Sequence, residues 1–141
     1  MLVILLLQMF VSGSVKMLNV SGIDHINLQV RNLNESCDFY SSLLGFVLLE
    51  DMADSKGRII GSATAKLALY ENPNLDNEDK SGFSHVSFHI NNFQDCEALC
   101  NSLGIDMSYG GVVAWQKSRS IYIKDPNGYE IELSEVWGGG L

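Results

Sequence analysis

Two histidines, His25 and His85, occupy the same place in a segment that the sequence contains twice. The first copy reads Gly-Ile-Asp-His-Ile-Asn-Leu-Gln-Val over residues 22–30, and the second reads Gly-Phe-Ser-His-Val-Ser-Phe-His-Ile over residues 82–90. In both copies apolar residues recur at every second position, which is the period of a half-buried β-strand. Because the two strands are equivalent, a twofold arrangement of the repeats would bring both imidazoles to one site that could hold a metal ion.

The strand expected near the end of the chain, residues 129–136, offers a further ligand. Its side chains Glu130, Glu132 and Ser134 alternate with apolar residues. A carboxylate from this strand would complete a set of two histidines and one carboxylate, which suits divalent iron, manganese, zinc or nickel and leaves coordination positions open. The alternative is that each histidine is a hydrogen-bonded structural residue and that the glutamates are solvated strand charges.

The remaining histidine, His89, is predicted to share a strand face with His85 and Ser87, because alternate residues of a strand point the same way. One interpretation is that His89 orients a metal ligand. The other is that it is a core histidine deeper in the sheet.

Each copy of the repeat continues with a helix and further strands. Asn32, with Glu35 as its capping-box partner, is expected to begin the first helix and Gly45 to end it, and Asn92 and Gly104 have the same roles in the second copy. The predicted apolar stripes of the helices are Leu33, Cys37, Tyr40 and Leu44, and Cys96, Leu99, Cys100 and Leu103. The further strands are predicted at 46–50, 58–62 and 65–71, within 107–115, and at 119–124 and 129–136, with an Asp-Pro-Asn-Gly turn at 125–128.

This order of elements, βαβββ twice, predicts an α+β fold in which two modules form a curled eight-stranded mixed sheet around the metal site. We expect one domain over residues 22–137, with modules at about 22–72 and 82–137 and a flexible tail at 138–141. Residues 1–21 are expected to be an N-terminal extension. Its apolar run is too short to span a bilayer, so it is either a signal peptide that lacks a leading positive charge or an extension upstream of a natural start at Met17.

The composition excludes one class of partner. A formal charge of −8 without a dense cluster of Lys and Arg argues against nucleic acid, and the sequence offers no membrane-binding segment. Small-molecule substrates and metal cations remain. The three cysteines, Cys37, Cys96 and Cys100, do not form a disulfide framework, and we expect reduced thiols in a cytoplasmic protein.

The chain resembles the vicinal oxygen chelate superfamily, which includes glyoxalase I, extradiol dioxygenases, fosfomycin-resistance thiol transferases, methylmalonyl-CoA epimerase and bleomycin-resistance proteins. The segments that carry the resemblance are Asp-His-Ile-Asn-Leu-Gln-Val (24–30) with Phe-Tyr-Ser-Ser-Leu-Leu-Gly-Phe (39–46), His-Val-Ser-Phe-His-Ile (85–90), and Tyr-Ile-Lys-Asp-Pro-Asn-Gly-Tyr-Glu-Ile-Glu-Leu (122–133). The resemblance covers residues 22 to about 136. It implies a metal held by His25, His85 and Glu132, and a homodimer.

The same resemblance identifies Tyr122 as the counterpart of a tyrosine that faces the substrate in dioxygenases and fosfomycin transferases. Tyr122 and His89 are therefore the catalytic candidates. The fourth ligand of the lyases falls on Leu67, which cannot coordinate, unless a register shift brings in Glu71. A three-ligand site favours dioxygenase-like or transferase-like chemistry over a glyoxalase I-like lyase, although no Lys or Arg follows Glu132 as the fosfomycin enzymes require.

The sequence therefore predicts a divalent-metal-dependent enzyme of the glyoxalase/dioxygenase type. Its small substrate would chelate the metal through adjacent oxygens. The alternative is a metal-free small-molecule binding protein, similar to the bleomycin-resistance proteins that bind an antibiotic.

Overall fold

The computed structural model describes residues 23–76, 80 and 82–140. The predicted N-terminal extension, residues 1–21, and part of the connector between the halves lie outside the described residues. No helix among the residues described is long and apolar enough to cross a membrane.

Each half of the chain forms a βαβββ module. Module one, residues 23–76, contains β1 (Ile26–Val30), α1 (Leu33–Leu44), β2 (Val47–Met52), the 3-10 turn η1 (Ala53–Ser55), β3 (Gly57–Gly61) and β4 (Lys66–Glu71). Module two, residues 82–140, contains β5 (His85–His89), the turn η2 (Phe93–Asp95), α2 (Cys96–Ser102), β6 (Met107–Ala114), β7 (Arg119–Lys124), β8 (Glu130–Ser134) and the turn η3 (Trp137–Gly140). The turn η3 includes residues 138–140 of the predicted tail.

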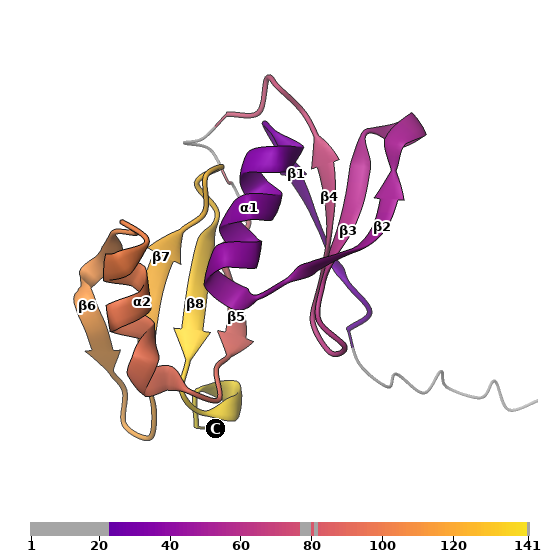
Figure 1. Ribbon diagram of the computed structural model, residues 1–141. Coiled ribbons are helices and arrows are strands. Elements are labelled where there is room, and N and C mark those ends of the chain that lie inside the picture. Colours follow the sequence, from indigo (N-terminus) through magenta and orange to yellow (C-terminus); the bar gives the residue numbers. More distant parts are fainter. Residues whose placement is uncertain (1–22, 77–79, 81, 141) are drawn as a thin grey trace, which may run out of the picture.

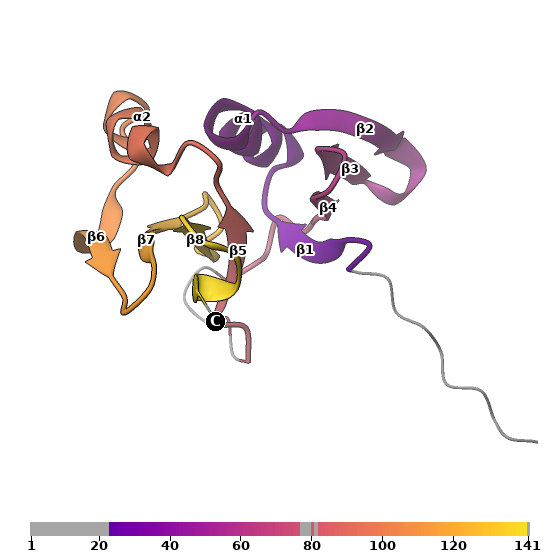
Figure 2. The ribbon, with the colours of Figure 1, turned by 90° about the horizontal axis from the view of Figure 1, so that it is seen from below.

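The strands form two four-stranded mixed sheets, in the orders β1-β4-β3-β2 and β5-β8-β7-β6. In each sheet the first strand of the module is parallel to its last strand, and the other neighbours are antiparallel. The predicted α+β fold of two βαβββ modules is confirmed. The eight strands are divided between two sheets that do not close around one centre, and both helices lie on the same side of them (Figures 1 and 2).

Helix α1 begins and ends where the sequence predicted. The side chain of Asn32 accepts a hydrogen bond from the backbone N–H of Glu35 at 2.9 Å, and Gly45 has the left-handed φ of 66° that favours glycine. The predicted stripe is partly wrong, because Ser36 and Leu43 are buried in place of Cys37 and Leu44, which are half-buried.

Helix α2 is shorter than predicted, because a 3-10 turn follows Asn92 and the α-helix begins at Cys96. Cys96 and Cys100 are buried and unpaired, as predicted. Leu99 and Leu103 are 37% and 40% exposed, so their place in the buried stripe is a wrong prediction. A helix of seven residues has only two turns with which to cover the sheet.

The two modules are joined through α1 and the turn between β7 and β8. The Tyr40 hydroxyl donates to Asp125 Oδ2 at 3.0 Å, and Asn127 Nδ2 donates to Ser36 Oγ at 2.9 Å. The backbone N–H of Arg31 donates to Asn127 Oδ1 at 2.8 Å. This turn is therefore buried under α1, and its hydrogen bonds fix the position of one module against the other.

Strand residues facing the helices form the hydrophobic core. The members that are at most 1% exposed include Val30, Leu67, Leu69, Ile121, Ile123, Ile131 and Leu133. Because successive strand residues point to opposite faces, Tyr122 and Glu132 lie on the other side of the module-two sheet. That face carries the candidate site.

Candidate metal centre

Strand register places three side chains of the module-two sheet abreast. Ser87 of β5 is opposite Glu132 of β8, and Glu132 is opposite Tyr122 of β7. His85 lies two residues before Ser87 and therefore on the same face. The apolar neighbours of these residues point into the core, so the sheet itself directs this polar set to the face away from the helices.

His85 and Glu132 meet at the centre of this polar set. His85 Nε2 is 3.2 Å from Glu132 Oε2, and the two side chains are 35% and 12% exposed. The other carboxylate oxygen, Oε1, accepts hydrogen bonds from Ser120 Oγ at 2.6 Å and from the Tyr122 hydroxyl at 3.1 Å. The two hydroxyls thus fix Oε1, and Oε2 is left facing the imidazole.

The surroundings of Glu132 keep its carboxylate ionised. Burial alone would raise the pKa of Glu132, but hydrogen bonds from Ser120, Ser87 and Tyr122 and the nearby imidazole of His85 hold that pKa below its usual value. The pKa of Tyr122 is raised, first by burial and then by its hydrogen bond to Glu132. At neutral pH the site therefore combines an anionic carboxylate with a protonated phenol.

His25 does not join His85 and Glu132 within one chain. Strands β1 and β4 are parallel, as are β5 and β8, and Figure 1 shows β4 and β8 pointing in opposite directions. His25 precedes β1 and His85 begins β5, so the two histidines lie at opposite ends of their respective sheets. Among the described residues, no group of three or more His, Cys, Asp or Glu side chains is placed to hold a metal.

Both histidines nevertheless have the same kind of local support. His25 Nδ1 is 2.6 Å from Asp24 Oδ2, and His85 Nδ1 is 3.2 Å from Ser84 Oγ. A partner on one ring nitrogen fixes the orientation of an imidazole and leaves the other nitrogen as the metal donor. In both residues the nitrogen that is left for a metal is Nε2.

His89 lies on the same face but contacts a different residue. Its ring stacks on Trp137, with the ring centres 4.3 Å apart and the planes at 15°. Both rings line a cavity of about 360 Å³ whose wall also includes Glu132, Ser87 and Ser134. His89 therefore adjoins the candidate site, as a wall of its cavity.

The position of a fourth ligand in module one follows from the strand register. Val86 is opposite Ile131 in module two, and Ile26 is opposite Leu67 in module one. The next pair along the strands is Ser87 with Glu132 in module two and Asn27 with Ala68 in module one. Ala68, rather than the predicted Leu67, is thus the counterpart of Glu132, and neither side chain can coordinate a metal.

Glu71, the other candidate for a fourth ligand, has a structural contact. Its Oε2 accepts a hydrogen bond from the backbone N–H of Leu33 at 3.2 Å, at the beginning of α1. An anionic oxygen at a helix N-terminus satisfies a backbone donor that has no partner within the helix. The carboxylate of Glu71 therefore supports α1.

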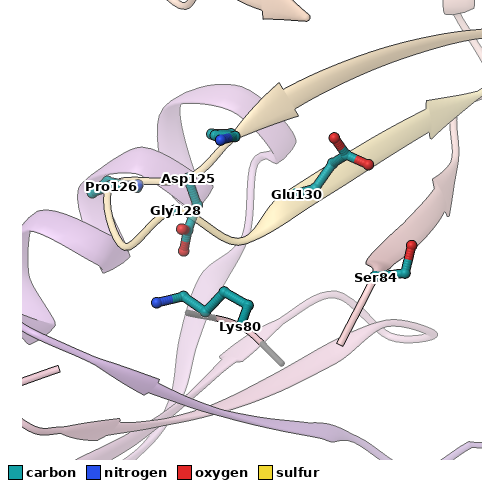
Figure 3. Close-up of a pocket in the computed structure, with 7 residues that line it drawn as sticks. Lys80, Ser84, Asp125, Pro126, Gly128 and Glu130 are labelled. Atoms are coloured by element: carbon teal, nitrogen blue, oxygen red, sulfur yellow. The ribbon is translucent and has the colours of Figure 1, made fainter. Parts of the chain in front are cut away.

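A second cavity, of about 600 Å³, is lined by Lys80, Ser84, Glu130 and the turn between β7 and β8. Figure 3 shows Glu130 on β8 and Ser84 just before β5, with Lys80 on the connector below them. Because Ser84 also contacts His85 Nδ1, this cavity reaches the edge of the candidate site.

Sequence reasoning missed the hydroxyl and carboxylate groups that support the ligands, namely Ser120, Ser84 and Asp24. A signal for Ser120 was present, because it precedes Tyr122 by two residues on a predicted strand and so shares its face. Asp24 and Ser84 are the immediate neighbours of the two histidines in the repeat.

Residues 22–133 match the family described as Glyoxalase/Bleomycin resistance protein/Dioxygenase superfamily. Metallothiol transferase FosB of Staphylococcus haemolyticus (strain JCSC1435) is 30% identical over 117 residues, which cover 81% of this chain and 83% of that protein. Lactoylglutathione lyase of Neisseria meningitidis serogroup A is 26% identical over 125 residues, covering 82% of this chain and 91% of the lyase. The crystal structure of the fosfomycin resistance protein FosX from Listeria monocytogenes (hexagonal form) has a TM-score of 0.70 at 22% identity, and covers 87% of this chain and 100% of FosX.

Proposed function

The chain belongs to the glyoxalase/bleomycin resistance protein/dioxygenase superfamily, and on that premise we propose that it is a divalent-metal-dependent enzyme acting on a small substrate. The substrate would chelate the metal through two adjacent oxygens. The observation that carries the proposal is the pair of His85 Nε2 and Glu132 Oε2, 3.2 Å apart, on a face where the carboxylate is kept ionised.

The donor set fits a divalent ion. One imidazole nitrogen and one carboxylate oxygen are ligands that iron, manganese, zinc and nickel share. Ser120 and Tyr122 hold Glu132 Oε1, and Ser84 holds His85 Nδ1, so both donor atoms are oriented before any ligand binds. The site lacks only a third protein ligand.

A second copy of the chain is the proposed source of that ligand, His25. Its Nδ1 is bound to Asp24, and the residue is exposed ahead of β1, away from His85 of its own chain. In a symmetric dimer each His25 would meet the His85 and Glu132 of the other copy, which gives two identical sites. A homodimer therefore unites the three predicted ligands that one chain keeps apart.

The reaction we propose is transferase-like. A bound divalent ion would act as a Lewis acid on the substrate oxygens. Glu132 contributes negative charge, and Tyr122, which stays protonated, would turn its hydroxyl from Glu132 Oε1 to donate a hydrogen bond to a substrate oxygen. The counterpart of Glu132 in module one is Ala68, which offers no carboxylate as a base for the proton transfer of a lyase, and Glu71 on the same strand is bound to the backbone N–H of Leu33. Attack by an external thiolate, which is already deprotonated and which the name metallothiol transferase implies for FosB, needs no base to remove a proton from the substrate.

A metal-free binding protein is the second candidate function. The observation in its favour is that the described residues of a single chain contain no three-ligand group. Metal content decides between the two, because a binding protein purified without chelator would contain no stoichiometric divalent ion.

Mixing two variants tests both the metal and the dimer. We expect the wild type to bind one divalent ion per chain, and His25→Ala and His85→Ala each to lose it. After subunit exchange the mixture should recover roughly one quarter of the wild-type metal content, because half of the dimers would carry one intact site of two. His89→Ala is the matched control and should keep the metal, since His89 stacks on Trp137.

The outcomes separate the alternatives. A wild type without metal supports the binding protein. If His25→Ala keeps its metal, His25 is not a ligand. If a dimeric mixture recovers no metal, the site is not shared between copies.

A further inference from the structure

Strand β6 contains a large irregularity at the level of Tyr122. Met107 is opposite Ile123 of β7, and Val112 is opposite Ile121. Residues 108–111 therefore all face the single position of Tyr122. Irregularities of this kind next to a functional site redirect a side chain that a regular strand would aim elsewhere.

The redirected side chain is that of Tyr109. It has a φ of 56°, in the left-handed region, and the two glycines that follow have φ values of 81° and 107°. A residue with a Cβ is disfavoured there, and such residues persist where the surroundings hold them, often at ligand-binding sites. A glycine at position 109 would adopt this backbone without strain, so the conformation alone does not call for tyrosine.

Two contacts hold the Tyr109 side chain over the candidate site. Its ring meets that of Tyr122 edge to face, with centres 5.4 Å apart and planes at 84°, and its hydroxyl donates to Glu130 Oε2 at 2.8 Å. Tyr122 in turn meets His85 at 5.8 Å and 82°. The rings of His85, Tyr122 and Tyr109 thus form a continuous row that leads outward from the proposed metal ligands.

Exposure distinguishes Tyr109 from the other tyrosines of module two. Tyr122 and Tyr129 are 8% and 7% exposed, whereas Tyr109 is 71% exposed. A tyrosine whose role is to stabilise the fold by packing would have a buried ring. This ring is held in a strained irregularity of β6 by its hydroxyl and one edge, and most of its surface is exposed in the single chain.

We propose that Tyr109 is a specificity-determining residue whose ring packs against a planar, unsaturated ring in the substrate, beyond the two oxygens that chelate the metal. This inference rests on the proposed function, because it needs a ligand anchored at His85 and Glu132. Aromatic rings in contact prefer offset or edge-to-face arrangements, which an exposed tyrosine held by its hydroxyl can provide.

The test uses two chelators with the same pair of adjacent oxygens, acetohydroxamate and benzohydroxamate. Calorimetric titration of the zinc-loaded protein should show that benzohydroxamate binds about tenfold more tightly, as expected for one added aromatic contact. Tyr109→Ala should bring the two affinities within about twofold of each other by removing this contact. Tyr109→Phe, which keeps the ring and loses the bond to Glu130, should retain the preference.

The failure of this inference is distinguishable from that of the proposed function. Equal binding of the two chelators to the loaded wild type, or a preference that survives in Tyr109→Ala, overturns the role of Tyr109 and leaves the metal site intact. Binding of neither chelator above the level of the metal-free protein overturns the metal site, and the inference with it.

A second measurement compares thermal stability, measured without metal, with the ligand preference of the zinc-loaded protein. Tyr109→Gly relieves the left-handed strain, so the variant should melt at or above the wild-type temperature while losing the preference for benzohydroxamate. A clearly lower melting temperature would show that Tyr109 serves the fold and would overturn the proposal.

Discussion

The two modules have the same order of elements but differ in the support they offer to a carboxylate. Module two surrounds Glu132 with hydroxyl donors on neighbouring strands, from Ser87, Ser120 and Tyr122. Matching the strand registers gives the module-one counterparts of these four residues, which are Ala68 for Glu132, Asn27 for Ser87, Gly57 for Ser120 and Ile59 for Tyr122.

The two modules of the duplicated fold provide different candidate metal ligands. Both modules keep the histidine at the beginning of the leading strand, with a polar neighbour on its Nδ1. Only module two surrounds this position with three hydroxyl donors, which stabilise an ionised carboxylate that is 12% exposed. Module one is thus equipped to supply one imidazole, and module two an imidazole and a carboxylate.

The largest effect on stability is expected when a carboxylate is introduced into module one at the counterpart of Glu132. Ala68→Glu would place a charge at a position that is 3% exposed and beside Gly57, Asn27 and Ile59. With the Asn27 amide in place of three hydroxyl donors, this buried and unpaired charge should lower the free energy of unfolding by about 3–5 kcal/mol, measured by urea denaturation at pH 7.

Ala68→Gln is the matched control, because it adds the same volume without the charge. The two variants should converge in stability at low pH, where the glutamate is protonated. If they are equally stable at pH 7, module one can support a carboxylate and the contrast between the modules is wrong.

An intermediate effect on stability is expected at the contact between the two modules. Tyr40→Phe removes the buried hydrogen bond to Asp125 and should lower the free energy of unfolding by about 2 kcal/mol at pH 7. Asp125 keeps the bond from Asn127 Nδ2, which limits the loss. Urea denaturation of both proteins measures the difference.

The difference in the free energy of unfolding between the wild type and Tyr40→Phe should become smaller at alkaline pH. Burial, followed by the charge of Asp125, raises the pKa of Tyr40 well above its usual value of 10.0. Below that usual value the folded and unfolded states both hold the proton, so the stabilisation is complete. Above it the unfolded state loses the proton first, and the wild type loses stability relative to Tyr40→Phe. If the stability difference between the two proteins is the same at pH 11 as at pH 7, the pKa of Tyr40 does not contribute to stability in this way.

The smallest effect is expected from one of the donors to Glu132. Ser120→Ala removes the hydrogen bond of 2.6 Å to Oε1, which lets the pKa of Glu132 rise and leaves its orientation less fixed. We expect about a tenfold loss of zinc affinity in a competition titration.

Ser134→Ala serves as the control for this loss. Ser134 is buried on the same sheet face, but its hydroxyl donates to the carbonyl of Val136. Equal losses in the two variants would mean that the donors to Glu132 have no special role.

Residues near one another in the chain allowed much of the fold to be predicted. The Asn32 cap, the Gly45 terminus and the alternation of the strands gave the βαβββ modules to within a few residues. The prediction failed where burial depended on distant partners. Ser36 of α1 is buried because Asn127 reaches it from 91 positions away, and no periodicity of the helix contains that information.

The sequence by itself determined the chemistry of the candidate ligands, because the repeat identified two equivalent histidines and the alternation of the last strand identified a carboxylate on one face. Only the tertiary structure decided which of these groups meet. His85 and Glu132 lie on adjacent parallel strands, whereas His25 precedes β1, which runs in the direction opposite to β5. That direction depends on how α1 packs over the β7–β8 turn, through contacts such as Tyr40 with Asp125, 85 positions apart. Local patterns fix which face a side chain occupies, and only long-range packing fixes what lies across from it.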